Sequence, residues 1–264
     1  MKIGVFDSGL GGLIIAQSLI RAMPAYDFAY LGDTANLPYG ARSDEKIYER
    51  ASACVDWLFK HQDCKIVIIA CNTASIAALR RLQREYLPSN FPERRVLGIV
   101  IPTIEAAAER GYRRVGLVGT ISTVRSRVYE QELAKLTHGA VELKSLATPL
   151  LVSLIENGGD NYAEAVLSDY LTGFKDAEAL ILGCTHYPRY KGLIRRMLPG
   201  LDVLSQDEIL PEKITSYLMR HPEIERELGR LGARFFGITD MTENYISVAR
   251  ELFGAEIMVE KVAV

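Results

Sequence analysis

Two segments of the sequence share one pattern, and this pattern constrains the fold more than any other feature. Residues 66–75 read IVIIACNTAS, and residues 180–188 read LILGCTHYP. Each is a short apolar run that ends in a small residue and is followed by cysteine, with threonine one or two positions later. The pattern predicts two buried strands, with Cys71 and Cys184 in the loops that lead to the next helices. Ligands of open α/β sheets bind at such strand ends.

Strand-like and helix-like segments alternate along the whole chain. Apolar, β-branched runs predict strands, and apolar residues at helical spacing predict helices. The expected strands are 3–6, 28–31, 66–70, 115–118, 141–146, 179–182, 234–237 and 257–259, and the expected helices are 10–23, 43–60, 74–86, 122–137 and 241–252. Such alternation is typical of parallel sheets built from right-handed βαβ units.

A second internal similarity suggests that the chain has two related halves. Residues 3–9 read IGVFDSG, and residues 115–120 read VGLVGT. Together with the two cysteine segments, this favours an α/β fold of two similar domains, with mainly parallel sheets flanked by helices. Each half would contribute one strand-end loop and one cysteine loop to an active site in the cleft between them.

Composition excludes several classes of protein. The 264 residues are 48% hydrophobic and 24% charged, with a net charge of −2, which is ordinary for a globular protein and gives no sign of binding nucleic acid. No apolar run reaches the ~18 residues of a membrane span, and Asp7 interrupts the first apolar stretch too early for a signal peptide. We therefore expect a cytoplasmic protein with no membrane association and with its four cysteines as free thiols.

The two matched cysteines are the strongest candidates for chemistry. A single buried cysteine is usually only a small apolar side chain, but two in equivalent loops are unlikely to arise by coincidence. At a helix N-terminus we expect the pKa of a thiol such as Cys71 to be lowered. One thiol on each side of a substrate could remove a proton from one face of a carbon and return a proton to the other.

Other polar groups lie close to these loops in the sequence. His186, two residues after Cys184, could assist its proton transfers or stabilise its thiolate. The sequence DSGLGG at 7–12 is either a capped helix start or a ligand loop whose Asp7 acts in a proton relay. It has neither dinucleotide-binding nor P-loop spacing. The PYG at 38–40 describes a turn by itself, although its backbone N–H groups could bind a carboxylate.

The remaining cysteines and histidines suggest no site. Cys54 lies on the apolar stripe of its expected helix, and Cys64 precedes a strand. His61 and Cys64 alone do not make a metal site, so we expect no metal. The cysteine motifs contain no lysine that would form a Schiff base with pyridoxal phosphate, so we expect no cofactor, and the thiols remain the only obvious bases.

Four motifs in combination resemble the glutamate racemases, which are cofactor-independent amino-acid racemases of the aspartate/glutamate racemase superfamily. They are DSGLGG at 7–12, PYG at 38–40, ACNTAS at 70–75 and GCTHYP at 183–188, and they extend over most of the chain. Aspartate racemases of the superfamily typically have glutamate after the second Cys-Thr, whereas this chain has His186. The resemblance therefore favours glutamate.

The resemblance implies specific roles and boundaries. Cys71 and Cys184 would be the two catalytic acid/bases, and Asp7 and His186 would assist them. The substrate would be bound by Ser8, Tyr39, Gly40, Asn72, Thr73 and Thr185. The first α/β domain would comprise residues 1–95 and 206–264, and the second residues 96–205. The family's product, D-glutamate, is used for cell-wall peptidoglycan.

Three alternatives stay open at this point. Another substrate of the superfamily, such as aspartate or a hydantoin, is the nearest of them. A protein that binds an amino acid without reaction would have no need for matched thiols, and a thiol redox protein would be expected to have a C-x-x-C motif. The sequence does not give the oligomeric state, and a homodimer is one option.

Overall fold

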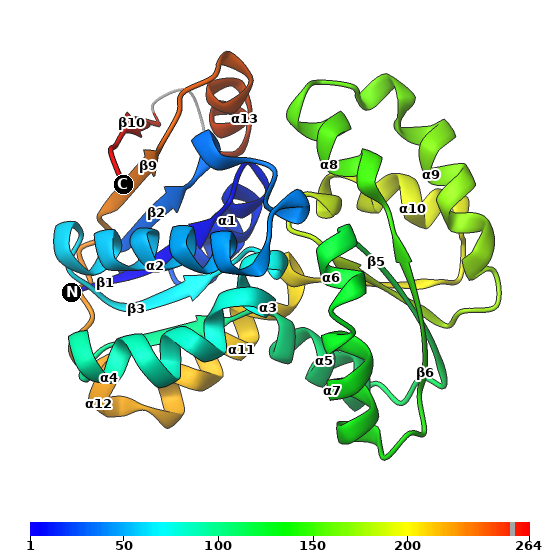
Figure 1. Cartoon of the computed structure of the whole chain (residues 1–264), viewed down its shortest axis with the longest axis horizontal. Coiled ribbons are helices and arrows are strands. Elements are labelled where there is room, and N and C mark those ends of the chain that lie inside the picture. Colours follow the sequence, from blue (N-terminus) through cyan, green and yellow to red (C-terminus); the bar gives the residue numbers. More distant parts are fainter. Residues whose placement is uncertain (254–256) are drawn as a thin grey trace.

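The computed structural model, which describes residues 1–253 and 257–264, has two lobes that lie side by side (Figure 1). Within these residues the strands form a six-stranded sheet of order β10-β9-β2-β1-β3-β4 and a four-stranded sheet of order β6-β5-β7-β8. All strand pairs in both sheets are parallel. The α/β fold with parallel sheets flanked by helices is therefore confirmed.

The first sheet is built from both ends of the chain. Its strands are β1 (Lys2–Asp7), β2 (Phe28–Gly32), β3 (Cys64–Ile69), β4 (Arg95–Gly98), β9 (Arg234–Ile238) and β10 (Glu260–Lys261). One face is covered by α1 (Gly11–Ala22), α11 (Gln206–Arg220) and α13 (Glu243–Phe253). The other is covered by α2 (Asp44–His61) and α3 (Asn72–Arg81), which continues through a π-helical turn (Leu82–Tyr86) into α4 (Leu87–Asn90).

Alternation along each central strand explains why both faces of this sheet are buried. In β3, Ile66 and Ile68 face the α1 and α11 side, while Val67 and Ile69 face the α2 and α3 side. Successive side chains of a strand point to opposite faces, so a continuous apolar run supplies both cores at once. This is why the apolar run before Cys71 could be recognised in the sequence as a buried strand.

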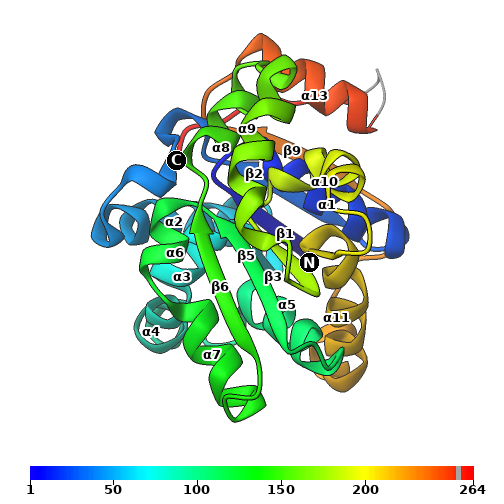
Figure 2. The ribbon, with the colours of Figure 1, turned by 90° about the vertical axis from the view of Figure 1, so that its right-hand side faces the viewer.

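The second sheet has fewer strands and is also covered by helices on both faces, and Figure 2 views this lobe from the front. Its strands are β5 (Arg114–Gly119), β6 (Glu142–Ala147), β7 (Ala179–Gly183) and β8 (Asp202–Ser205). One face packs against α5 (Val100–Glu109) and α7 (Val128–Thr137), and the other against α8 (Pro149–Glu156), α9 (Ala163–Leu171) and α10 (Lys191–Met197). The short helices α6 (Ile121–Arg125) and α12 (Pro222–Glu225) complete the fold.

Some elements differ from the expectation. The single helix expected over 122–137 is two helices, because Arg127 has a left-handed backbone (φ 56°) between α6 and α7. The last strand lies at Glu260–Lys261 and not at 257–259. β4 and β8 were not expected at all, since each has only four residues and begins with a charged one.

The chain crosses between the lobes twice. It leaves the first sheet after β4, enters the second lobe with α5, and returns after β8 directly into α11. We propose the domain boundaries 1–95 with 206–264 and 96–205, except that residues 96–98 belong with the first sheet, because β4 pairs with β3 as far as Gly98. In the part of the chain that the structure describes, no helix has the length and apolar character needed to cross a membrane.

Candidate active site

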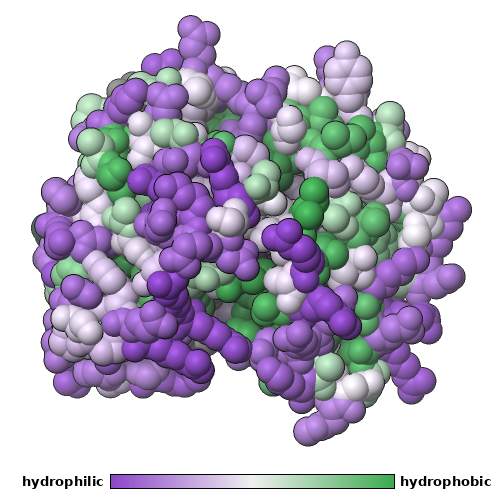
Figure 3. Space-filling model, in the orientation of Figure 1, coloured by the Kyte–Doolittle hydropathy of each residue, from purple (hydrophilic) through white to green (hydrophobic). Residues whose placement is uncertain are grey.

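A cavity of about 680 Å³, including its open mouth, lies between the lobes at the carboxyl ends of the strands. The first lobe lines it with residues that follow β1, β2 and β3, and the second lobe with residues that follow β5, β6 and β7. Apolar side chains at its wall include Leu37, Ile121 and Val152. Figure 3 shows hydrophobic residues gathered in the groove between the lobes, while much of the surrounding surface is hydrophilic.

Cys71 and Cys184 both line this cavity, one from each lobe. Each thiol lies within two residues of the end of a central strand, Cys71 after β3 and Cys184 after β7, and each is only 6% exposed. The expectation that the two matched segments lead to one cleft is therefore met by the structure.

Cys71 caps the helix that follows it, yet its pKa is raised and not lowered. Its Sγ accepts hydrogen bonds from the Ala74 N–H and the Ser8 hydroxyl, both at 3.5 Å. Burial and the negative charge of Asp7 raise the pKa of Cys71 to about 12, and the two hydrogen bonds only partly oppose this. The expected lowering by the helix N-terminus is thus wrong, because desolvation of the thiolate outweighs the dipole.

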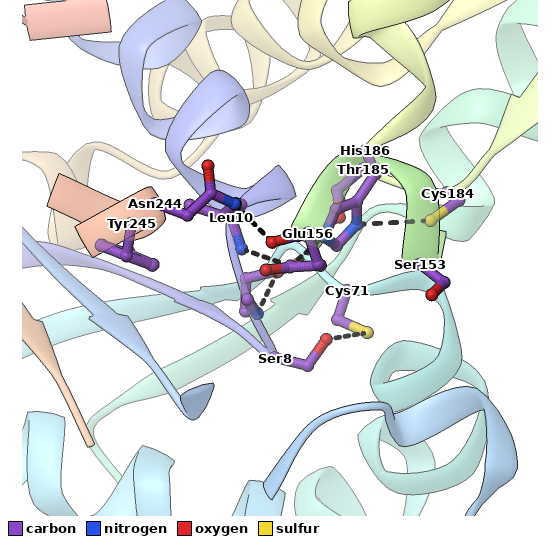
Figure 4. Close-up of polar contacts among 12 residues, drawn as sticks. Ser8, Leu10, Cys71, Ser153, Glu156, Cys184, Thr185, His186, Asn244 and Tyr245 are labelled. Carbon is purple, nitrogen blue, oxygen red and sulfur yellow. Dashed lines mark hydrogen bonds and ion pairs between the residues drawn. The ribbon is translucent and has the colours of Figure 1, made fainter. Parts of the chain in front are cut away.

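Cys184 has a different partner. Figure 4 shows the His186 ring between this thiol and Glu156, with 3.6 Å from Cys184 Sγ to Nδ1 and 2.5 Å from Nε2 to Glu156 Oε1. Burial alone would lower the pKa of His186, but its hydrogen bonds to Cys184 and Glu156 and their negative charges outweigh burial and raise it well above the usual value. His186 therefore lies between the thiol of one catalytic candidate and a carboxylate.

Glu156 is a site residue that the sequence did not indicate. It lies at the end of α8, and its Oε1 also accepts a hydrogen bond from the Leu10 N–H at 3.0 Å (Figure 4). The carboxylate therefore joins the loop after β1 in the first lobe to His186 in the second. Nothing in the local sequence of α8 distinguishes this residue from a surface glutamate.

Asp7 lies behind the cavity wall and contacts the second lobe. Its Oδ1 accepts a hydrogen bond from the Gly9 N–H at 2.8 Å, and its Oδ2 accepts one from the Thr185 hydroxyl at 3.1 Å. Burial raises the pKa of Asp7 to about 6, although the charge of His186 and these hydrogen bonds oppose the rise. The Asp7 side chain is fully buried and does not line the cavity. It is therefore not placed to contact a substrate in the cavity.

The six residues expected to bind substrate all line the cavity; they are Ser8, Tyr39, Gly40, Asn72, Thr73 and Thr185. The segment around Tyr39 is held from behind, because the Tyr39 hydroxyl donates to Asp33 Oδ2 at 2.6 Å. Burial alone would raise the pKa of Asp33, but hydrogen bonds from Arg50, Tyr39 and Asn36 outweigh it and lower the pKa. Asp33 is therefore a buried anion that fixes this wall.

Thr120 is a further residue that lines the cavity, and the internal similarity in the sequence could have indicated it. It follows β5 at the position that ends the internal similarity between 3–9 and 115–120, and its Oγ1 lies 3.0 Å from Thr73 Oγ1 of the other lobe.

In the described residues 1–253 and 257–264, no group of three or more His, Cys, Asp or Glu side chains is placed to hold a metal ion.

Comparison with known proteins places this site in a family. The family model described as Asp/Glu/Hydantoin racemase matches residues 4–207 of the chain. The chain belongs to this family. It is therefore an isomerase of the amino-acid racemase type.

Individual relatives agree with this assignment. The chain is 39% identical over 241 residues to a glutamate racemase from Dinoroseobacter shibae, with 85% of this chain and 86% of the relative covered. The solved glutamate racemase from Francisella tularensis, in complex with D-glutamate, matches with a TM-score of 0.87 and 30% identity over 100% of this chain and 97% of that one. A glutamate racemase structure from Thermus thermophilus, in complex with beta-chloro-D-alanine, has a TM-score of 0.81 and 37% identity, with 100% of this chain and 97% of that one covered.

Proposed function

We propose that this racemase interconverts L- and D-glutamate without a cofactor, with Cys71 and Cys184 as its two bases. The observation that carries the proposal is that two thiols from matched strand ends, one in each lobe, line the same cavity. The glutamate racemases to which the chain is similar, one of them solved with D-glutamate, support the choice of substrate.

In this mechanism one cysteine starts as thiolate and the other as thiol. The thiolate takes the α-proton of glutamate and becomes a thiol, while the C–H electron pair remains on the carbon and its carboxylate. The other thiol then gives its proton to the opposite face of the α-carbon and becomes a thiolate. No atoms are gained or lost overall, and the two cysteines exchange roles when the other enantiomer reacts.

The two thiols have different surroundings, which suits the opposite roles that the mechanism gives them. The pKa of Cys71 is raised to about 12 by burial and by Asp7, which keeps this thiol protonated. The pKa of His186 is raised by its partners, so an imidazolium lies beside Cys184. In this arrangement Cys71 suits the thiol that donates a proton, and His186 is placed to assist the other cysteine.

Carbanion formation is the difficult step, because an α-amino carboxylate is a weak carbon acid. Fixed hydrogen-bond donors around the carboxylate stabilise the negative charge that moves onto it, and they act strongly where water is excluded. Asn72, Thr73 and Thr185 are suited to this task, since all three line the cavity and are nearly buried. The Thr185 hydroxyl already donates to Asp7, so Thr185 has only its backbone N–H to offer. The placement of both thiols beside the bound substrate lowers the barrier further.

The proposed reaction supplies D-glutamate, which we propose is used for cell-wall peptidoglycan. Two catalytic thiols must stay reduced to act as bases, and thiols stay reduced in the cytoplasm. We therefore place the reaction there as part of this proposal.

A racemisation assay tests the proposal. Circular dichroism should show loss of optical activity for both L- and D-glutamate with the purified protein and no added cofactor. Cys71→Ala and Cys184→Ala should each abolish the reaction, whereas Cys54→Ala should keep it, because Cys54 is a buried free cysteine on α2 outside the cavity. Full activity in either cavity variant would overturn the two-base mechanism, and activity on aspartate alone would overturn the choice of substrate.

A further inference from the structure

A buried polar cluster lies beside the active-site cavity, between the two lobes. The Tyr129 hydroxyl donates to Asn72 Oδ1 at 2.6 Å, and Gln206 Nε2 donates to the same oxygen at 3.1 Å and to the Tyr129 oxygen at 3.2 Å. Tyr129 is 1% exposed, Asn72 is 2% exposed and Gln206 is 0% exposed. Bulk water therefore does not compete for these hydrogen bonds.

The members of this cluster come from three separate elements. Asn72 is the first residue of α3 and follows Cys71, while Tyr129 lies on α7 of the second lobe. Gln206 is the first residue of α11, at the point where the chain returns to the first lobe. The cluster thus joins the cysteine loop of one lobe to the other lobe and to a crossover between them.

The directions of these hydrogen bonds follow from the groups present. Burial raises the pKa of Tyr129 above its usual range, so the hydroxyl is neutral and has one hydrogen to donate. It gives this hydrogen to Asn72 Oδ1 and accepts from Gln206. Because a carbonyl oxygen has two lone pairs, the hydrogen bonds from Tyr129 and Gln206 use the full acceptor capacity of Asn72 Oδ1.

The other end of the Asn72 amide is unoccupied. Among the described residues, Asn72 Nδ2 is buried and has no hydrogen-bond partner. A buried donor without a partner is costly, and buried polar groups are nearly always paired. Asn72 lines the cavity, so an acceptor on a bound ligand can supply the missing partner.

We propose that Tyr129 and Gln206 are positioning residues, which fix the Asn72 amide so that its NH₂ group is presented to a carboxylate of the substrate. The proposal rests on the proposed function, since it takes the ligand to be glutamate. It adds that substrate affinity depends on two side chains that do not touch the substrate. It also links the substrate contact to the packing of the two lobes, because Tyr129 and Asn72 belong to different lobes.

Titration of the protein with racemic glutamate tests this directly, since turnover does not change the composition of the ligand. Tyr129→Phe removes the hydroxyl and Gln206→Met removes the amide at similar volume. We expect each variant to bind glutamate about five- to tenfold more weakly, the effect of one lost hydrogen bond. Tyr190→Phe is the matched control, because the Tyr190 hydroxyl donates to Asp160 and the residue does not line the cavity. It should bind as the wild type does.

The same changes in an Asn72→Ala background separate positioning from general loss of structure. If Tyr129 and Gln206 act through Asn72, their substitution in this background should change the affinity by less than about twofold, while thermal unfolding still reports any cost in stability. An undiminished loss of affinity in the Asn72→Ala background would overturn the proposal, as would unchanged affinity of both single variants.

A crystal structure of Tyr129→Phe gives a readout that does not depend on activity. We expect the Asn72 amide to be rotated or disordered, and an unchanged amide would count against the proposal. A wild-type protein that binds glutamate but does not racemise it would overturn the proposed function alone, because the affinity ratios would still decide the roles of Tyr129 and Gln206.

Discussion

Replacement of Asp7 by asparagine should stabilise the protein while impairing the enzyme. Asp7 is fully buried, and its pKa is raised from 3.8 to about 6, chiefly by burial. Each pKa unit corresponds to about 1.4 kcal/mol, so ionised Asp7 disfavours the folded state by about 3 kcal/mol. The substituted asparagine carries no charge, and its amide can still accept from the Gly9 N–H and donate to the Thr185 oxygen, so the packing is kept.

The sign of the pH dependence follows from proton binding. Between pH 3.8 and about 6 the folded state holds the Asp7 proton and the unfolded state has lost it. The contribution of Asp7 to stability therefore falls as pH rises through this window, and about 1.4 kcal/mol of the loss occurs between pH 5 and 8.

Chemical denaturation of wild type and Asp7→Asn at several pH values measures this effect. The variant should gain stability relative to wild type by about 1.4 kcal/mol as pH is raised from 5 to 8. The racemisation rate of the variant should be lower than that of the wild type. A variant that is more stable but less active would show that the buried charge is retained for function. A stability difference that is constant with pH, or that shrinks as pH rises, would refute the reasoning.

Three further substitutions test other parts of the site. Glu156→Gln should lower the pKa of His186 by removal of an anion, so the alkaline limb of the pH–rate profile should move to lower pH; an unmoved limb would exclude this role for Glu156. Gly11→Ala should lower both stability and activity, since a Cβ there would clash with Thr185 Oγ1. At Gly192 on α10 an added Cβ would make only an ordinary contact with Arg196 Nη1 at 3.9 Å, so denaturant melts should show Gly192→Ala neutral or slightly stabilised. Thr120→Val should cost about 0.5–2 kcal/mol in urea unfolding, because Thr120 caps α6, and Thr120→Ser should recover most of this; equal losses in both would argue against the cap.

The central strands of the fold were predictable because their side chains are apolar on both faces. The run before Cys71 and the run before Cys184 each supply two cores, and a short run that is apolar on both faces is typical of a buried parallel strand. β4 and β8 escaped prediction because four residues carry too little pattern. The break between α6 and α7 depends on a left-handed backbone at Arg127, which a non-glycine residue rarely adopts.

The site was predictable where a residue lies next to a strand end, and not where it reaches the site through the tertiary fold. Cys71 and Cys184 follow directly from local pattern. Glu156 meets His186 from the end of a helix 30 residues away, and Gln206 meets Asn72 over 134 residues. The raised pKa of Cys71 likewise depends on burial, which the sequence around a helix start does not reveal.

The two-base mechanism is tested most directly by the fate of hydrogen during turnover in D₂O. L-glutamate is incubated with the enzyme, and the α-hydrogen of both isomers is followed by NMR and mass spectrometry at low conversion. With two thiols on opposite faces, the D-glutamate formed should carry deuterium at the α-carbon, while the remaining L-glutamate keeps its hydrogen. Early appearance of deuterium in the unreacted L-glutamate, at a rate similar to product formation, would contradict two separate bases and show that one group serves both faces.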